Sequence, residues 1–408
     1  MGLVPILLPI VAVRHGVGHV GLVMGAFSLG AAAAPAVGNL ADRRRAYRSL
    51  AAACALLCAV SLSLFPLAAA ALQPLLGLAN GAGFAGAVTV ANLLIVERHP
   101  RAEWNSRLGW LETALSVGQG GGLVLAAWLS GLTARNALLI AAFVPAAAIP
   151  LALMLIPRMT GSAPAAGPAA GTANPAAGHH LASAGQVGEW GPASPLRVRP
   201  LHQRTLADLR RAAGLLRGPF GWMLASWIPA YAGTAIIFAL YPVLFSRAFG
   251  VAPRSSAVAF AVIVFLSLPL FIVAGRVSQR HCPAATLAGG FAARVVLLAA
   301  LAALAAVGHV PAILPLAAFG GVMFAWSFLS VASPGLTGQL VPGAEGDAQG
   351  ALNAASGLAG LGGSVVGGFA ASLWGYPAAL GIGAGAVLAG LSVFAATVLR
   401  FPRASGTP

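Results

Sequence analysis

Apolar stretches of about 20 residues recur from one end of this chain to the other, and short segments between them carry most of the charge. Each stretch is long enough to cross a hydrocarbon core of roughly 30 Å as an α-helix. Lipid offers no partner to a bare peptide group, so such spans are helices that satisfy their own backbone. Only 8% of the 408 residues are charged, against about 25% in a soluble domain. The chain is therefore predicted to be an all-α integral membrane protein.

The apolar stretches and their polar breakers predict twelve transmembrane helices in two pseudo-symmetric six-helix bundles. The first six lie near 2–13, 20–40, 49–69, 71–96, 108–131 and 134–157, and the second six near 219–246, 255–275, 284–307, 311–337, 350–374 and 377–399. The N-terminal half thus covers residues 1–157 and the C-terminal half residues 219–408. The first helix is expected to be truncated at its N-terminal end, because its twelve residues reach only about 18 Å.

The segment 158–218 between the halves is rich in Ala, Pro and Gly and cannot bury enough apolar surface to fold alone. It is predicted to be a disordered cytoplasmic linker. Its last part, 201–217, places Leu206, Leu209 and Leu216 near one helical face opposite several arginines. That pattern is typical of a helix lying on an anionic membrane surface.

The two halves repeat two short motifs in the same order. The stretch with Pro9 and Arg14 matches the stretch with Pro242 and Arg247 at an offset of 233 residues. One span later, GNLADR (38–43) matches GRVSQR (275–280) at an offset of 237 residues. Such internal repeats are typical of transporters.

Together with the twelve spans and the long central segment, GNLADRRRAYR between the second and third spans resembles the major facilitator superfamily over essentially the whole chain. Gly38, Asp42 and Arg43 fit the family's motif, although Arg45 stands where a second Gly is expected. The resemblance implies a gating loop made of these residues with Gly275 and Arg280 of the second copy. A carboxylate there can meet the positive end of a neighbouring helix. The alternative is a solvated loop that only sets orientation.

In this family the first, fourth, seventh and tenth spans line the solute cavity. The candidate substrate-binding residues are polar or aromatic and share helical faces on three of these spans: Gln73 and Asn80 on the fourth, Trp227, Tyr231 and Phe238 on the seventh, and Trp326 and Ser330 on the tenth. Aromatic bodies with polar tips suit an amphiphilic or ring-bearing solute. The alternative is that these stripes pack or face lipid.

Ionisable groups within a membrane are costly and usually mark function. Glu112 is the one acid inside a predicted span, and it shares a face with Ser116 and Gln119. It is the candidate proton-coupling residue, with an interfacial ion pair to Arg107 as the alternative. Arg294 is the other charge within a span. It either contacts an anion or extends to the interface.

These features predict a secondary active transporter of a small organic solute, acting as a proton-coupled exporter by a rocking motion. Gln73, where exporters of the family usually carry Arg, and the glycines 118–122 without a proline weaken the drug-export interpretation. An uncoupled facilitator, an importer, and a non-transporting sensor or scaffold stay open as alternatives. We find no compact cluster of catalytic groups typical of an enzyme.

Small-molecule solute, protons and membrane lipids are the expected partners. No four-ligand metal set and no Gly-Lys-Ser/Thr phosphate loop occur, so we expect no metal and no cofactor. The formal charge of +15 does not indicate nucleic acid, because the arginines lie in the gaps between spans rather than on one folded face. We expect a monomer in the inner (plasma) membrane.

The arginines also predict the orientation, because cytoplasmic loops hold the excess of basic residues. All 23 basic residues are arginine; 18 sort to the side of the linker and four to the other side. Both termini and the linker should therefore be cytoplasmic. Reporter fusions at Pro408 test this, and a periplasmic or extracellular signal would overturn the topology.

Overall fold

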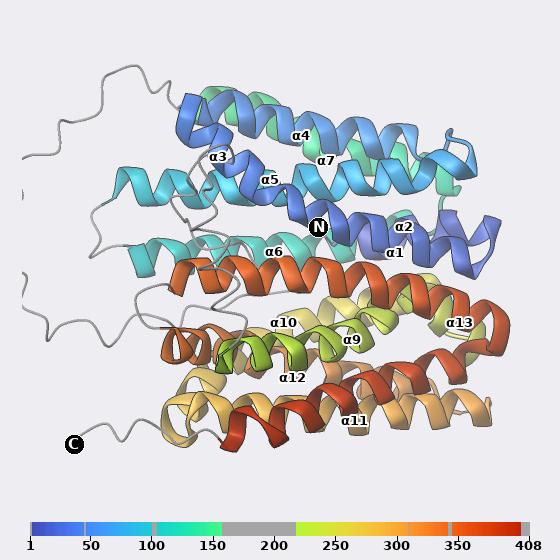
Figure 1. Cartoon of the computed structure of the whole chain (residues 1–408). Helices are drawn as coiled ribbons and strands as arrows, with labels where there is room; N and C mark the ends of the chain where they lie inside the picture. The colour runs from blue at the N-terminus through green and yellow to red at the C-terminus, as the bar shows by residue number, and fades with distance from the viewer. Residues whose placement is uncertain are drawn as a thin grey trace, which may run out of the picture.

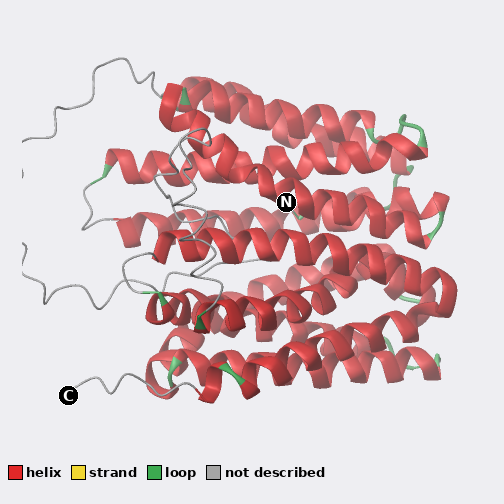
Figure 2. Ribbon diagram, in the orientation of Figure 1, coloured by secondary structure: helices red, strands yellow, loops and turns green. Residues whose placement is uncertain are grey.

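The computed structural model describes residues 2–44, 46–99, 104–156, 218–308, 310–341 and 345–400. Throughout this part of the chain the regular structure is helical (Figure 2). The helices lie side by side with their long axes roughly parallel or antiparallel (Figure 1). The predicted linker and the interfacial helix at 201–217 fall almost entirely outside the described residues.

Each half contributes a consecutive set of helices. The first half contains α1 (Val4–Ala12), α2 (Val17–Gly30), α3 (Ala34–Arg44), α4 (Tyr47–Leu64), α5 (Gln73–Arg98), α6 (Trp104–Leu129) and α7 (Ala134–Leu155). The second contains α9 (Pro219–Phe249), α10 (Pro253–His281), α11 (Pro283–Val307), α12 (Ile313–Leu340) and α13 (Glu345–Ala396). A short 3-10 segment, Ala31–Ala33, joins α2 to α3, so these two helices together form the second predicted span.

Nine helices of the described part are long and apolar enough to cross a membrane, by length and composition, and Val4–His15 and Thr113–Leu129 are shorter apolar helices. The longest, α13, has 52 residues, which would be about 78 Å as a straight helix. It doubles back at Gly375 (Figure 1), whose φ of 84° is accessible to glycine because no Cβ obstructs it. The all-helical integral membrane fold is thus confirmed, while the count of twelve and the truncation of the first helix stay predictions.

The connections alternate between the two ends of the bundle. The turns at 13–16, 65–72, 130–133 and 250–252 and the bend of α13 gather at one end, on the right of Figure 1. The end of α7 and the start of α9, which flank the linker, lie at the opposite end. This alternation is what successive crossings of one membrane require.

The backbone at 38–43 is helical, so the prediction of a loop there is wrong. Helix α3 continues to Arg44, so this segment forms its last turns, and the second copy, 275–280, likewise lies inside α10. The reason is that no proline or second glycine occurs between Asn39 and Arg44 to end the helix.

Glycines bring helix backbones into direct contact, both within and between the halves. Within the first half, a Cβ added at Gly81 of α5 would fall on the carbonyl oxygen of Phe27 of α2. Between the halves, a Cβ at Gly21 would fall on the carbonyl oxygen of Ser364 and lie 2.9 Å from the Cα of Gly368 in α13. The spacing of Gly360, Ser364 and Gly368 predicts such close packing.

Helix α13 is also the main partner of α9. A Cβ at Gly363 would fall on the carbonyl oxygen of Ala232, and one at Gly233 on that of Gly383 in the second arm of α13. The first arm of α13 therefore touches α2 of the first half and α9 of the second at the same depth. These three helices meet where the two halves join.

Replacing Gly21 by Ala should loosen this junction, since the new methyl group would overlap the α13 backbone. We expect the free energy of unfolding to fall by about 1–3 kcal/mol, the usual cost of overpacking. Gly121→Ala in α6 is the matched control, because nothing lies within 4 Å of a Cβ at that position. Thermal unfolding in detergent compares the two variants. Equal melting temperatures would contradict the close contact at Gly21.

Candidate functional site

Four aromatic side chains, Trp227, Tyr231, Phe291 and Trp326, form a cluster between α9, α11 and α12. The Trp227 ring lies 6.0 Å from Tyr231, 6.1 Å from Phe291 and 6.4 Å from Trp326, and Tyr231 meets Trp326 edge to face at 6.0 Å. Trp227 Nε1 also donates a hydrogen bond to Ser356 Oγ of α13 at 2.8 Å. Three of the predicted site residues are thus brought together. This set is called the aromatic cluster below.

Arg294 of α11 points inward to this cluster and does not extend to the interface. Its side chain is 1% exposed, and its Nη1 donates to Thr234 Oγ1 at 2.9 Å. Its guanidinium carbon lies 5.1 Å from the centre of the Trp326 ring, in cation–π contact. Arg294 therefore links α11 to α9 and α12 from within the second half.

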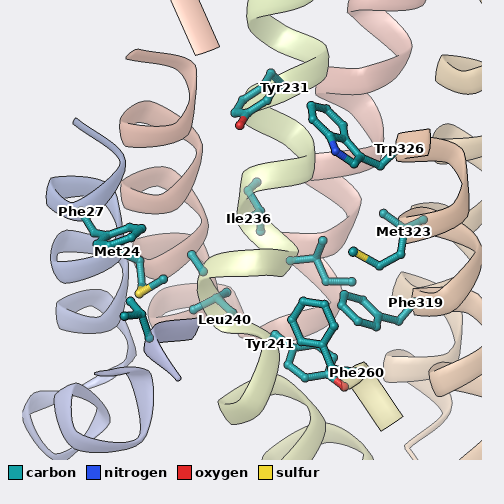
Figure 3. Close-up of a cluster of buried hydrophobic side chains, with 14 of the residues drawn as sticks. Met24, Phe27, Tyr231, Ile236, Leu240, Tyr241, Phe260, Phe319, Met323 and Trp326 are labelled. Atoms are coloured by element: carbon teal, nitrogen blue, oxygen red, sulfur yellow. The ribbon is translucent and has the colours of Figure 1, made fainter. Parts of the chain in front are cut away.

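A small cavity, with room for about one water molecule, lies at the junction of α2, α9 and α13. Its walls come from both halves. The lining residues are Met24 and Ser28 of α2, Tyr231, Ala235, Phe238 and Ala239 of α9, and Gly360 and Ser364 of α13. Figure 3 shows α9 between α2, which carries Met24 and Phe27, and α12, which carries Met323 and Trp326. Tyr231 belongs both to the cavity wall and to the aromatic cluster.

The remaining candidates of the seventh and tenth spans lie around this centre. Phe238 lines the cavity and packs edge to face on Phe319 at 5.7 Å. Ser330 is buried, and its hydroxyl donates to the backbone oxygen of Ser327 one turn earlier in α12. Ser330 is not among the residues that line this cavity.

The two candidates on α5 face neighbouring helices of the first half instead. Gln73 is buried, and its Oε1 lies 2.9 Å from Nε2 of His19 on α2. Asn80 Nδ2 donates to Ser61 Oγ at 3.0 Å and to the Cys58 oxygen at 3.3 Å, both on α4. These bonds tie α5 to α2 and α4, and neither side chain lines the cavity.

The structure describes only some of the predicted gating and proton-coupling residues. Gly38 is buried, with Thr89 the nearest side chain to a Cβ at that position. Gly275 is half-buried and Arg280 is exposed, both in α10. The side chains of Asp42, Arg43 and Glu112 lie outside the described part, although their backbones belong to α3 and α6.

Helix α2 lines the cavity with Met24 and Ser28, which the sequence analysis does not predict. Met24 and Ser28 lie one turn apart on α2, before and after Gly25, which with Gly21 faces α13. Small residues four apart on α2, opposite a similar row on α13, were the available signal, because such rows mark close helix contacts. Nothing in the sequence, however, indicates that α2 and α13 face each other.

Comparisons with known proteins agree with this helical membrane architecture. A family model described as the Major Facilitator Superfamily matches residues 1–332. The chain belongs to the major facilitator superfamily. Members of this superfamily are transporters and not enzymes, which places the present protein among integral membrane transporters of small solutes.

Solved structures of superfamily members share the fold over nearly the full chain. The nucleoside transporter NupG has a TM-score of 0.69 at 14% identity, covering 97% of this chain and 94% of that one. A D-xylose–proton symporter has a TM-score of 0.69 at 14% identity, covering 100% and 96%.

A bacterial homologue of the human lysosomal transporter Spinster, in an inward-facing and unoccupied conformation, has a TM-score of 0.66 at 15% identity, covering 98% and 92%. No curated protein matches the sequence. At these identities the likeness to the solved structures shows the fold alone.

The bond between Arg294 and Thr234 can be tested by a pair of substitutions. Thr234→Val keeps the shape of the side chain but removes the acceptor of a buried charged donor, so stability should fall by about 1.5–3 kcal/mol. Thr234→Ser retains the hydroxyl and is the matched control. Thermal unfolding in detergent measures both, and a Val variant as stable as the Ser variant would show that this bond contributes nothing.

Proposed function

We propose that this superfamily member is a secondary active transporter that exports a small organic solute in exchange for protons, by rocking its two halves about a central site. The observation that carries the proposal is the cavity at the junction of α2, α9 and α13, because its walls come from both halves. A solute held there touches both halves. Separation of the halves at either end would release it to that side.

The contact between the halves suits such a motion. At Gly21 and Gly25 the backbone of α2 lies directly on α13, with Ser364, Leu361 and Gly368 opposite. Backbone surfaces without long side chains offer few interlocking groups to be repacked when the helices move apart. A second contact joins α6 to α10, where a Cβ at Gly120 would lie 2.5 Å from the Phe265 ring.

The gating role of the repeated motif is part of this proposal. Gly38, Asp42 and Arg43 lie near the end of α3, and Gly275 and Arg280 lie near the end of α10, at the same end of the bundle (Figure 1). Charges in the last turns of these helices can pair with neighbouring groups of the other half in one state and separate in the other. Arg280 is exposed and thus accessible for such pairing.

Proton coupling rests on Glu112, whose backbone lies in the first half of α6 with Ser116 and Gln119 following on the same face. A similar fold is found in a protein named as a D-xylose–proton symporter, which supports a coupled mechanism here. An uncoupled facilitator is the second candidate. It is favoured by Gln73, which contacts His19 and stands at the position where exporters of the family usually carry an arginine.

Proteoliposomes with an entrapped pH-sensitive dye test the coupling. Uridine, D-xylose and methylphosphonate are added in turn, and proton movement is followed for wild type and Glu112→Gln. We expect at least one solute to drive protons through wild type, and the Gln variant, fixed in the neutral form, to abolish this while still exchanging labelled solute.

Three outcomes would contradict the proposal in different ways. If Glu112→Gln still moves protons with the solute, Glu112 is structural and coupling lies elsewhere. If wild type carries labelled solute without moving protons, the facilitator takes its place. If no solute moves at all, the sensor or scaffold interpretation gains.

A further inference from the structure

We propose that the solute of this transporter carries an anionic group, a carboxylate or a phosphonate, which binds to Arg294 of α11 and to buried N–H groups of α12 and α13. The proposal rests on the transport function proposed above and narrows its substrate class. In the conformation described here the site is closed, because the neighbouring cavity beside Tyr231 has room for only about one water molecule. The solute reaches these groups when the two halves separate there.

Arg294 places a positive charge at the middle of the membrane-spanning part of the second half. It lies 11 residues after Pro283, the first residue of α11, and 13 before Val307, the last. These separations are about 16 Å and 20 Å along the helix, so the side chain reaches neither interface. Its acceptor, Thr234, is the central residue of α9. Ionisable groups at this depth are costly and usually mark the path of a substrate or an ion.

The sign of the charge favours an anion. Helices α9, α10, α11 and α12 contain no acidic residue in their sequences, and the two acids of α13, Glu345 and Asp347, stand in its first turn. A guanidinium presents its N–H donors in a planar fork that matches two oxygens of a carboxylate or phosphonate. A cationic solute would instead meet a like charge away from water, where the repulsion is strong.

Trp326 of α12 provides a buried donor beside this charge. The guanidinium carbon of Arg294 lies 5.1 Å from the centre of its ring. Trp326 is 4% exposed, and its Nε1 has no hydrogen-bond partner among the described residues. In the adjacent ring, by contrast, Nε1 of Trp227 donates to Ser356. A buried N–H without an acceptor is costly, and an anionic oxygen is a strong acceptor for it.

Asn353 of α13 supplies a second such donor. It lies one turn before Ser356, which accepts the bond from Trp227, and on the same face of α13. Its Oδ1 accepts from Gln349 Nε2 at 3.4 Å, whereas its buried Nδ2 has no partner within the part of the chain that the structure describes. Three helices thus bring a cation and two N–H groups to the aromatic cluster. All of these groups donate, and an ionised carboxylate or phosphonate only accepts.

The test is a titration of tryptophan fluorescence with the full-length protein in nanodiscs of zwitterionic lipid, at fixed ionic strength. Trp326 lies against Arg294 and is the nearest reporter. The probes are butyrate, butyramide and butylammonium, which share a carbon skeleton but differ in charge, and methylphosphonate. We expect at least one of the two anions to bind at least about tenfold more tightly than butyramide and butylammonium, and their ratio tells which anionic group is preferred. Empty nanodiscs correct for partition into lipid.

Removing the charge should remove this preference. Arg294→Gln keeps a donor for Thr234 but is neutral, so it should weaken anion binding at least about tenfold and leave butyramide unchanged. A purely structural role of Arg294 would not alter the ratio of anion to amide. Arg254→Gln is the matched control, because it removes the same charge from an exposed residue in the first turn of α10. This control should bind as wild type does.

Two further variants keep the proposal testable should Arg294→Gln fail to fold. Trp326→Phe keeps a ring and removes only the Nε1 donor, with Trp227 as the remaining reporter at 6.4 Å. It should weaken anion binding about tenfold, the scale of one hydrogen bond to a charged group. Asn353→Asp has nearly the same shape but replaces the Nδ2 donor by a charged oxygen, so it should abolish anion binding.

Two kinds of result would overturn the assignment. Butyrate and methylphosphonate binding no more tightly than butyramide would show that the site does not select an anion. Anion binding unchanged in the folded variants of Arg294, Trp326 and Asn353 would place the anion elsewhere. Because the titration needs no transport, anion binding without solute movement in proteoliposomes overturns the transport function alone, and transport of uridine or D-xylose without anion binding overturns only the solute class.

Discussion

The architecture depends on the close approach of helix backbones at glycine. Between helices in lipid the hydrophobic effect gives little driving force, so association relies on tight van der Waals packing and hydrogen bonds. The contacts of Gly21 with Gly368, Gly81 with Phe27, and Gly363 with Ala232 bring α2, α5, α9 and α13 into direct backbone contact. A side chain added at Gly21, Gly81 or Gly363 would push two helices apart. The position of α13 between α2 and α9 follows from this constraint.

The cavity and its surroundings follow from the same contacts. Where α2, α9 and α13 cross, Ser28, Gly360 and Ser364 are too small to fill the space between the helices, and the side chains of Met24, Tyr231 and Phe238 close it only in part. Behind the wall, larger groups fill the second half, with Tyr241 stacked near Phe319 at 4.2 Å and Arg294 on Trp326. Packed aromatic side chains therefore lie behind the α9 wall of the cavity, whereas the α13 wall consists of the small residues Gly360 and Ser364.

Much of the fold could be predicted because each span is a local property of the chain. The predicted spans coincide with the helices within a few residues, since an apolar run in lipid has to satisfy its own backbone and the polar breakers are few. The prediction of a loop at 38–43 is wrong because it follows the family motif, whereas no proline or glycine occurs between Asn39 and Arg44 to end the helix. Trp227 and Tyr231 share one face of α9, because helical spacing puts aromatic residues of one span on one face, and Trp326 of α12 packs against both.

The sequence by itself determined that this chain crosses a membrane many times, that two short motifs recur in the same order along it, and which residues of α9 and α12 are aromatic and share a face. Only the tertiary structure decided that Gln73 and Asn80 turn to α2 and α4, that Arg294 points inward to Thr234, and that Met24 and Ser28 complete the cavity. The physical reason is that hydropathy and helical period are local and fix which residues share a face. Which helix that face meets is set by backbone approach at glycines far apart in the chain, and no local pattern specifies those partners.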